Sequence, residues 1–181
     1  MTQTRQELLS RADNQMREGA HAAAFQTYRS TWRTHGGSMN DIERVWLLLS
    51  IANAAVRAEE FDEALGALSA LVEHFSDTGI VVGNPLFHLL VGLGYHGLEE
   101  NPDGETDNFA RALICGGPAI FDNEDPAHLE KIQRILKPPA ETGQWEGYTG
   151  CSRDLLDDAP GYLRELLTDR LGQAPPYTYP D

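Results

Sequence analysis

Capping signals at the starts of short amphipathic segments are the sequence feature that most constrains this chain of 181 residues. Thr4 and Glu7 have the spacing of a capping box, in which each side chain binds the backbone amide of the other residue. Asn40 and Glu43 have the same spacing. Apolar residues follow both pairs at intervals of three and four, which predicts a helix after each of them.

Proline and glycine delimit the remaining helices. Pro85 and Pro126 each follow a cap residue and stand at the first helical position, where the missing amide hydrogen costs nothing. Glycine pairs at 36–37 and 116–117 end two helices, and prolines at 138–139 end another. The predicted helices cover about residues 4–18, 20–34, 40–58, 61–75, 84–98, 106–115 and 125–137, with a last one within 158–171.

The β-branched residues 80–82 are the best candidate for a strand, but an isolated strand has no pairing partner. We therefore interpret them as part of a buried loop between residues 76 and 83. The prediction is an all-α fold of about eight helices. Gly92 and Gly94, inside an apolar helix, predict close contacts between helices.

The helices also fall into pairs whose second members begin alike. An alanine follows three residues after Ala20, after Phe61 and after Phe109, which predicts close approach of the paired helices. Residues 54–75 resemble a tetratricopeptide repeat, with small or aromatic residues at the positions where that family places them. These positions are Ala58, Phe61, Ala64 and Ala70.

This resemblance covers residues 12–117 and implies an α-α superhelix of stacked antiparallel helix pairs. The pair offsets of 41 and 48 residues exceed the regular repeat of about 34 residues, so the array is degenerate. An irregular helical bundle is the alternative. We assign residues 1–137 to the helical-repeat domain. Residues 138–181 are assigned to a loop, a final helix and an extended tail that pack on it.

The chain is strongly acidic, with 28 acidic residues against 14 basic ones and a net charge of −14. A surface of this sign repels phosphate backbones and anionic membranes, so we expect neither nucleic acid nor membrane as a partner. It favours association with a basic protein. The polar N-terminus predicts no signal peptide, and we expect a cytoplasmic location.

No motif predicts catalysis, a metal site or a cofactor. There is no G-x-S-x-G sequence, and Cys115 and Cys151 have no metal-ligand spacing, which favours inert thiols. No two histidines have H-x-x-x-H spacing, and His88 and His96 lie two helical turns apart. The prediction is a chain without catalytic or metal-binding residues, in which the histidines are structural or solvated.

The acidic residues cluster between positions 99 and 125, where eight acids face only Arg111 and give half of the net charge. Charge reversal at Glu124 and Asp125 is expected to weaken the binding of a basic partner without changing the helical circular dichroism. Solvated loops are the alternative interpretation of the cluster.

Aromatic residues nearby and in later loops either anchor a partner or pin the loop to the core; Tyr177 and Tyr179 in the tail belong to this group. The predicted partner-binding residues are Glu99, Glu100, Asp103, Glu105, Asp107, Phe121, Asp122, Glu124, Asp125, Trp145 and Tyr148.

Residues 110–126, ARALICGGPAIFDNEDP, look like segments of helical immunity proteins. Together with the acidity and the degenerate repeats, this run resembles the immunity proteins of bacterial polymorphic or type VI secreted toxins. The resemblance implies a protein that binds and neutralises a cognate toxin, often a basic nuclease. A general helical-repeat adaptor or chaperone is the first alternative, and a small hydrolase with an unrecognised site is the second.

Overall fold

The prediction of an all-α fold is confirmed by the computed structural model, which describes residues 3–75, 79, 81–140 and 143–172. Within these residues the chain forms eight α-helices and no strand. They are α1 (Arg5–Arg17), α2 (His21–His35), α3 (Asp41–Arg57), α4 (Phe61–Phe75), α5 (Pro85–Leu98), α6 (Pro102–Gly116), α7 (Pro126–Ile135) and α8 (Gly161–Leu171), with short 3-10 turns η1 (Gly36–Ser38), η3 (Pro118–Phe121) and η4 (Arg153–Leu156).

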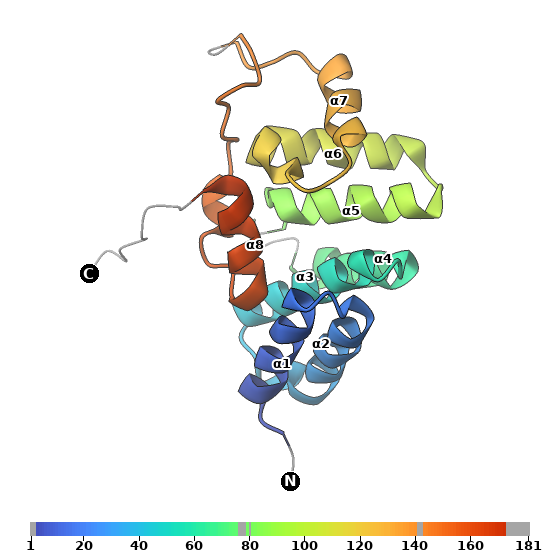
Figure 1. Ribbon diagram of the computed structural model, residues 1–181, viewed down its shortest axis with the longest axis vertical. Helices are drawn as coiled ribbons and strands as arrows, with labels where there is room; N and C mark the ends of the chain where they lie inside the picture. The colour runs from blue at the N-terminus through green and yellow to red at the C-terminus, as the bar shows by residue number, and fades with distance from the viewer. Residues whose placement is uncertain (1–2, 76–78, 80, 141–142, 173–181) are drawn as a thin grey trace, which may run out of the picture.

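The first six helices form a stack in which each helix packs against the next one in the chain (Figure 1). The pairs α1–α2, α3–α4 and α5–α6 are each joined by a short turn, which makes the two helices antiparallel neighbours. This is the superhelical arrangement that the sequence predicted. One hydrophobic core runs through the whole stack.

The chain returns to its beginning after the stack is complete. Helix α7 packs on α6, and α8 then packs against both α1 and η3. Arg17 of α1 donates hydrogen bonds to both carboxylate oxygens of Glu165 in α8, at 2.8 and 2.5 Å. Helix α8 therefore connects the start of the stack to the segment that follows α6. Residues 173–181 lie outside the described residues.

Both predicted capping boxes are present. Thr4 accepts a hydrogen bond from the Glu7 amide, and Glu7 accepts one from the Thr4 amide. At α3, Asn40 Oδ1 accepts from the Glu43 amide at 2.9 Å, and Glu43 Oε2 accepts from the Asn40 amide at 3.0 Å. Local sequence alone therefore sets the beginnings of α1 and α3.

The Asn40 cap supports a stability prediction. We expect Asn40→Ala to lower the free energy of unfolding by about 1 kcal/mol, because the Glu43 amide in the first turn of α3 loses its side-chain acceptor. Urea denaturation followed by circular dichroism measures this. Ser38→Ala is the control, because its hydroxyl only donates to the His35 carbonyl at the end of η1. An equal loss in both variants would contradict a specific capping effect.

The prediction for the start of α6 was wrong. The sequence predicted a helix from about residue 106, but the helix begins at Pro102. Asn101 is the actual cap and accepts from the Gly104 amide at 3.0 Å. The missed signal is an asparagine followed by proline, the same pattern that correctly marked α5.

Glycines in α5 let it approach both neighbouring helices. A Cβ on Gly92 would lie 2.4 Å from the Phe109 ring of α6, and one on Gly97 would lie 2.4 Å from the Phe61 ring of α4. Gly94 has a similar contact with Leu65. The predicted close helix contacts at Gly92 and Gly94 are therefore confirmed. Helix α5 is the central helix against which α4 and α6 pack.

Three apolar residues at helical spacing, for which hydrophobic periodicity predicts burial, are exposed instead: Ile42 (51%), Val72 (48%) and Ile135 (61%). Ile42 lies in the first turn of α3 and Ile135 ends α7, so each is exposed near a helix end. Val72 lies on α4, which packs only against α3 and α5 among the major helix contacts of the described chain. Of the predicted buried loop 76–83, Val81 is buried and Val82 is exposed, while residues 76–78 and 80 lie outside the described residues. Among the described helices, none is both long and apolar enough to cross a membrane.

Candidate functional site

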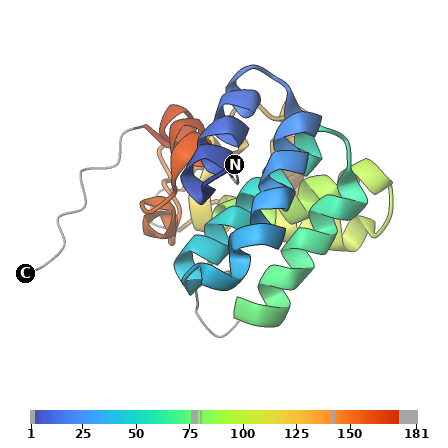
Figure 2. The same cartoon turned by 90° about the horizontal axis from the view of Figure 1, so that it is seen from below.

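Three helix-joining turns lie next to one another along one side of the stack (Figure 2). The His21 ring, at the start of α2, lies 3.2 Å from the Arg57 carbonyl at the end of α3. The Phe61 ring, at the start of α4, packs on Gly97 near the end of α5. The turns α1–α2, α3–α4 and α5–α6 therefore form one continuous edge.

This edge carries exposed carboxylates from all three turns. We call it the acidic edge, and it comprises Glu18, Glu59, Glu60, Asp62, Glu63, Glu99, Glu100 and Asp103. Arg29 forms an ion pair with Glu63 at 2.8 Å. The sequence interpretation found only the α5–α6 part of this edge, because the other acids lie far away along the chain. Short runs of acids at the preceding turns were the available signal.

The predicted partner-binding residues divide into exposed and buried groups. The exposed ones are Glu99, Glu100, Asp103, Asp107, Asp122 and Asp125. Phe121 is not the exposed anchor considered from the sequence, because it is 4% exposed and packs edge-on against Phe109 at 5.8 Å between ring centroids. Glu105 and Glu124 also have largely buried side chains, 12% and 4% exposed.

Glu124 is the centre of a buried ion-pair network. Its carboxylate accepts hydrogen bonds from Arg57 of α3 and from Arg170 of α8, the latter at 2.6 Å. The Arg170 side chain is 1% exposed and also donates to the Ile120 carbonyl at 2.7 Å. The network joins three segments that are distant in the sequence. The role of Glu124 is therefore structural.

The expectation of unchanged circular dichroism after reversal at Glu124 and Asp125 assumed solvated side chains, whereas the Glu124 side chain is 4% exposed. Reversal at Glu124 would place a third positive charge beside Arg57 and Arg170. Asp125 caps α7 by accepting from the Ala127 amide at 2.9 Å. Neither residue is suitable for testing partner binding.

The loop that carries Trp145 and Tyr148 is pinned to the end of α6. The Tyr148 hydroxyl donates to the Ile114 carbonyl at 2.6 Å, and the Trp145 ring packs edge-on against Tyr148. Gly117 leaves no room for a Cβ beside the Tyr148 carbonyl. These contacts favour the loop-pinning interpretation over the anchor interpretation. Tyr177 and Tyr179 lie outside the described residues.

The two cysteines, distant in the sequence, are neighbours in the fold. The Cys151 amide donates to the Ile114 carbonyl, and the Ser152 amide donates to the Cys115 carbonyl, at 3.1 and 3.0 Å. Both thiols are free; Cys115 is partly buried and Cys151 is exposed. Burial is the main cause that raises the pKa of the Cys115 thiol, and proximity to Cys151 raises it further.

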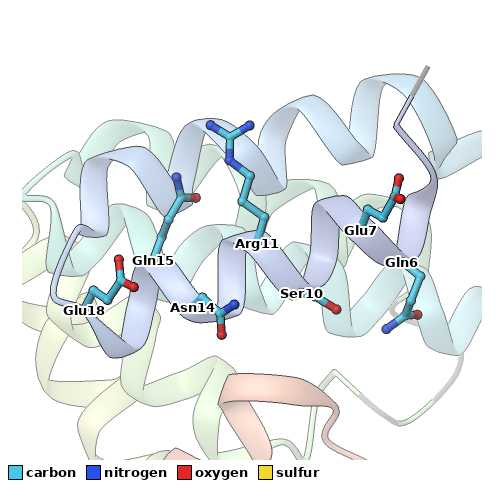
Figure 3. Close-up of a pocket in the computed structure, with 7 residues that line it drawn as sticks. All are labelled: Gln6, Glu7, Ser10, Arg11, Asn14, Gln15 and Glu18. Carbon is cyan, nitrogen blue, oxygen red and sulfur yellow. The ribbon is translucent and has the colours of Figure 1, made fainter. Parts of the chain in front are cut away.

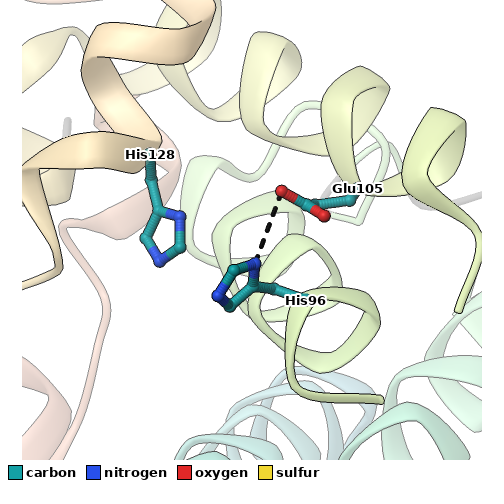
Figure 4. A group of neighbouring side chains, drawn as sticks. All are labelled: His96, Glu105 and His128. Carbon is teal, nitrogen blue, oxygen red and sulfur yellow. Dashed lines mark ion pairs between the residues drawn. The ribbon is translucent and has the colours of Figure 1, made fainter. Parts of the chain in front are cut away.

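A second cluster of chemistry-bearing side chains lies beside the acidic edge. His96 from the last turn of α5, Glu105 from the first turn of α6 and His128 from the first turn of α7 point toward one another (Figure 4). One ligand atom of each residue lies within 4.8 Å of the others. His96 Nδ1 lies 3.6 Å from Glu105 Oε1, and the two imidazole rings meet edge-to-face at 4.5 Å.

The surroundings of this cluster set its charges. Lys131 of α7 donates to Glu105 Oε1 at 3.0 Å and partly neutralises it. Burial, with a smaller contribution from His96, lowers the pKa of His128 and favours its neutral form. A search of the sequence for histidine pairs at i,i+4 spacing misses this cluster, because its three members come from three different helices.

Two surface depressions lie outside these clusters. A groove of about 320 Å³ lies between α1, α3 and the start of α8, with exposed Ile42 on its rim and the Tyr28–Asp13 hydrogen bond in its wall. A shallower one follows the outer face of α1 (Figure 3). Its polar side chains recur at intervals of three and four along one helix and do not converge on a common point. The second depression is a solvated helix face.

Comparison with known proteins finds no matching family model, no similar curated protein and no similar solved structure.

Proposed function

We propose that this chain is a protein-binding module that docks a basic partner on its acidic edge, and that it acts as an immunity protein that neutralises a cognate toxin. The observation that carries the proposal is the continuity of the edge. Exposed carboxylates from three successive helix pairs lie along it, of which Glu63 is ion-paired with Arg29. Carboxylates gathered on one edge repel one another, and a cationic partner relieves that repulsion.

The architecture supports the same proposal. Stacked helix pairs present extended surfaces that are suited to protein partners. The acidic residues of the edge lie in turns and first helical turns, so their side chains contribute little to the core. Solubility alone would not require negative charges to be concentrated on one edge of the protein.

Charge reversal at the edge tests the proposal. Glu60→Lys combined with Glu100→Lys is expected to weaken the complex by about 10-fold or more, because each change removes an attraction and adds a repulsion. The measurement is co-purification and calorimetric titration against the product of an adjacent gene, chosen because it encodes a toxin domain. Raising the salt concentration should weaken the wild-type complex in the same direction.

Glu146→Lys combined with Asp169→Lys is the matched control. It changes the net charge equally, at exposed residues in the 143–152 loop and on α8, outside the acidic edge. We expect this variant to retain most of the affinity. Equal weakening in both double variants would show a general charge effect and contradict docking on the edge. Failure of the wild-type chain to bind the adjacent product would remove the immunity proposal.

A further inference from the structure

We propose that His96, Glu105 and His128 bind a divalent transition-metal ion of the Zn²⁺ type, which clamps α7 onto the α5–α6 turn. The proposal is independent of the partner proposed above. It rests on the ligand set, the burial and the geometry of the cluster.

The ligand set selects the class of ion. Two imidazole nitrogens and one carboxylate are typical ligands of Zn²⁺ and of other late first-row metals, whereas Mg²⁺ and Ca²⁺ prefer oxygen ligands only. Three protein ligands leave at least one position of a tetrahedral ion for water or for a residue of another molecule. The exposed side of His96 gives that position access to solvent, since 54% of its side chain is accessible.

The geometry needs only a small adjustment. Ligand atoms around one tetrahedral Zn²⁺ lie about 3.3–3.5 Å apart, because each is about 2.0–2.1 Å from the metal. The His96–Glu105 pair is already at 3.6 Å, and the longest separation in the cluster is within 4.8 Å. The exposed His96 side chain has room to rotate toward the other two ligands, while the buried His128, which is 7% exposed, is held in place.

Lys131 competes with a metal ion for Glu105. Its ammonium lies 3.0 Å from Glu105 Oε1 and occupies part of the space in which a cation would sit. A bound metal ion has to displace it, and the 41% exposure of the Lys131 side chain allows the ammonium to swing into solvent. Loss of this competing charge should therefore strengthen metal binding, whereas a purely structural Glu105–Lys131 ion pair predicts no such gain.

The experiment is calorimetric titration of the untagged full chain, stripped with a chelator, with Zn²⁺. We expect one ion per chain and a rise in thermal stability at saturating Zn²⁺. His96→Ala should weaken binding by about 100-fold or more, since even outer-shell partners of metal ligands contribute about 10–100-fold. His96 is the ligand to replace first, because its exposed side chain contributes least to folding. Lys131→Met should tighten binding by about two- to fivefold, the range of an exposed ion pair.

Two controls separate this site from other metal-binding groups. His74→Ala removes another exposed histidine, and it should leave the affinity unchanged. Co²⁺ substitution should give a visible spectrum without a thiolate charge-transfer band, which excludes the Cys115–Cys151 pair as the site. A thiolate band, absence of stoichiometric Zn²⁺ binding, or full affinity in His96→Ala would each overturn the proposal.

Discussion

Replacement of Glu124 by alanine is expected to lower the free energy of unfolding by about 3–5 kcal/mol, because it leaves a buried positive charge without its partner. The Arg170 side chain is 1% exposed, and among the described residues its guanidinium has only the Ile120 carbonyl as another hydrogen-bond acceptor. Arg57 loses its carboxylate partner at the same time. Urea denaturation, followed by circular dichroism, measures the loss.

Two variants sharpen this prediction. Glu124→Gln keeps the shape and one acceptor oxygen, so we expect a smaller loss of about 1–3 kcal/mol. Asp122→Ala removes an exposed carboxylate two residues away, and it should change stability by less than about 0.5 kcal/mol. If Glu124→Ala were as stable as Asp122→Ala, the network would not hold α3, α8 and the segment before α7 together.

A methyl group added at Gly92 is expected to destabilise the protein by about 1–3 kcal/mol through overpacking. The new Cβ would lie 2.4 Å from the Phe109 ring, which is fully buried between α5 and α6. Either the ring leaves its position or the two helices separate. The midpoint of thermal or urea unfolding measures the effect.

Gly66→Ala, also inside a helix, is expected to have the opposite effect on stability. Gly66 lies inside α4 and is exposed, and a methyl group added there would meet no neighbouring side chain within 4 Å. Alanine there should stabilise the protein by about 0.5–1 kcal/mol, because glycine loses more backbone freedom on folding. Phe109→Leu should partly rescue Gly92→Ala, since the two sites share one contact. Stabilisation by alanine at both glycines would mean that α5 and α6 do not approach this closely.

The sequence predicted the helices well where the signal is local. The capping boxes of α1 and α3, and the proline starts of α5 and α7, depend on residues within one helical turn of each other. The actual start of α6 also carries a local signal, an Asn-Pro pair, but this signal was missed. Exposure of Ile42 and Ile135 was not predictable in this way, because it depends on which neighbour covers a helix end.

The acidity was predictable as a total, but its distribution was not. Net charge is a sum over the chain, so the sequence alone determined the value of −14. The stacking of the helix pairs decided which acids share the acidic edge, and it placed Glu124 between Arg57 and Arg170 rather than in solvent. These two arginines are 67 and 46 positions away from Glu124, a separation that no local pattern records.

The sequence by itself thus determined an acidic chain of eight short helices, because caps, proline starts and hydrophobic periodicity act within a few residues. Only the tertiary structure decided which side chains meet. It brought His96, Glu105 and His128 together from three helices, and it made Cys115 and Cys151 neighbours. The physical reason is that such contacts depend on how helices pack and how the chain returns, and packing is set by the shapes of the whole core.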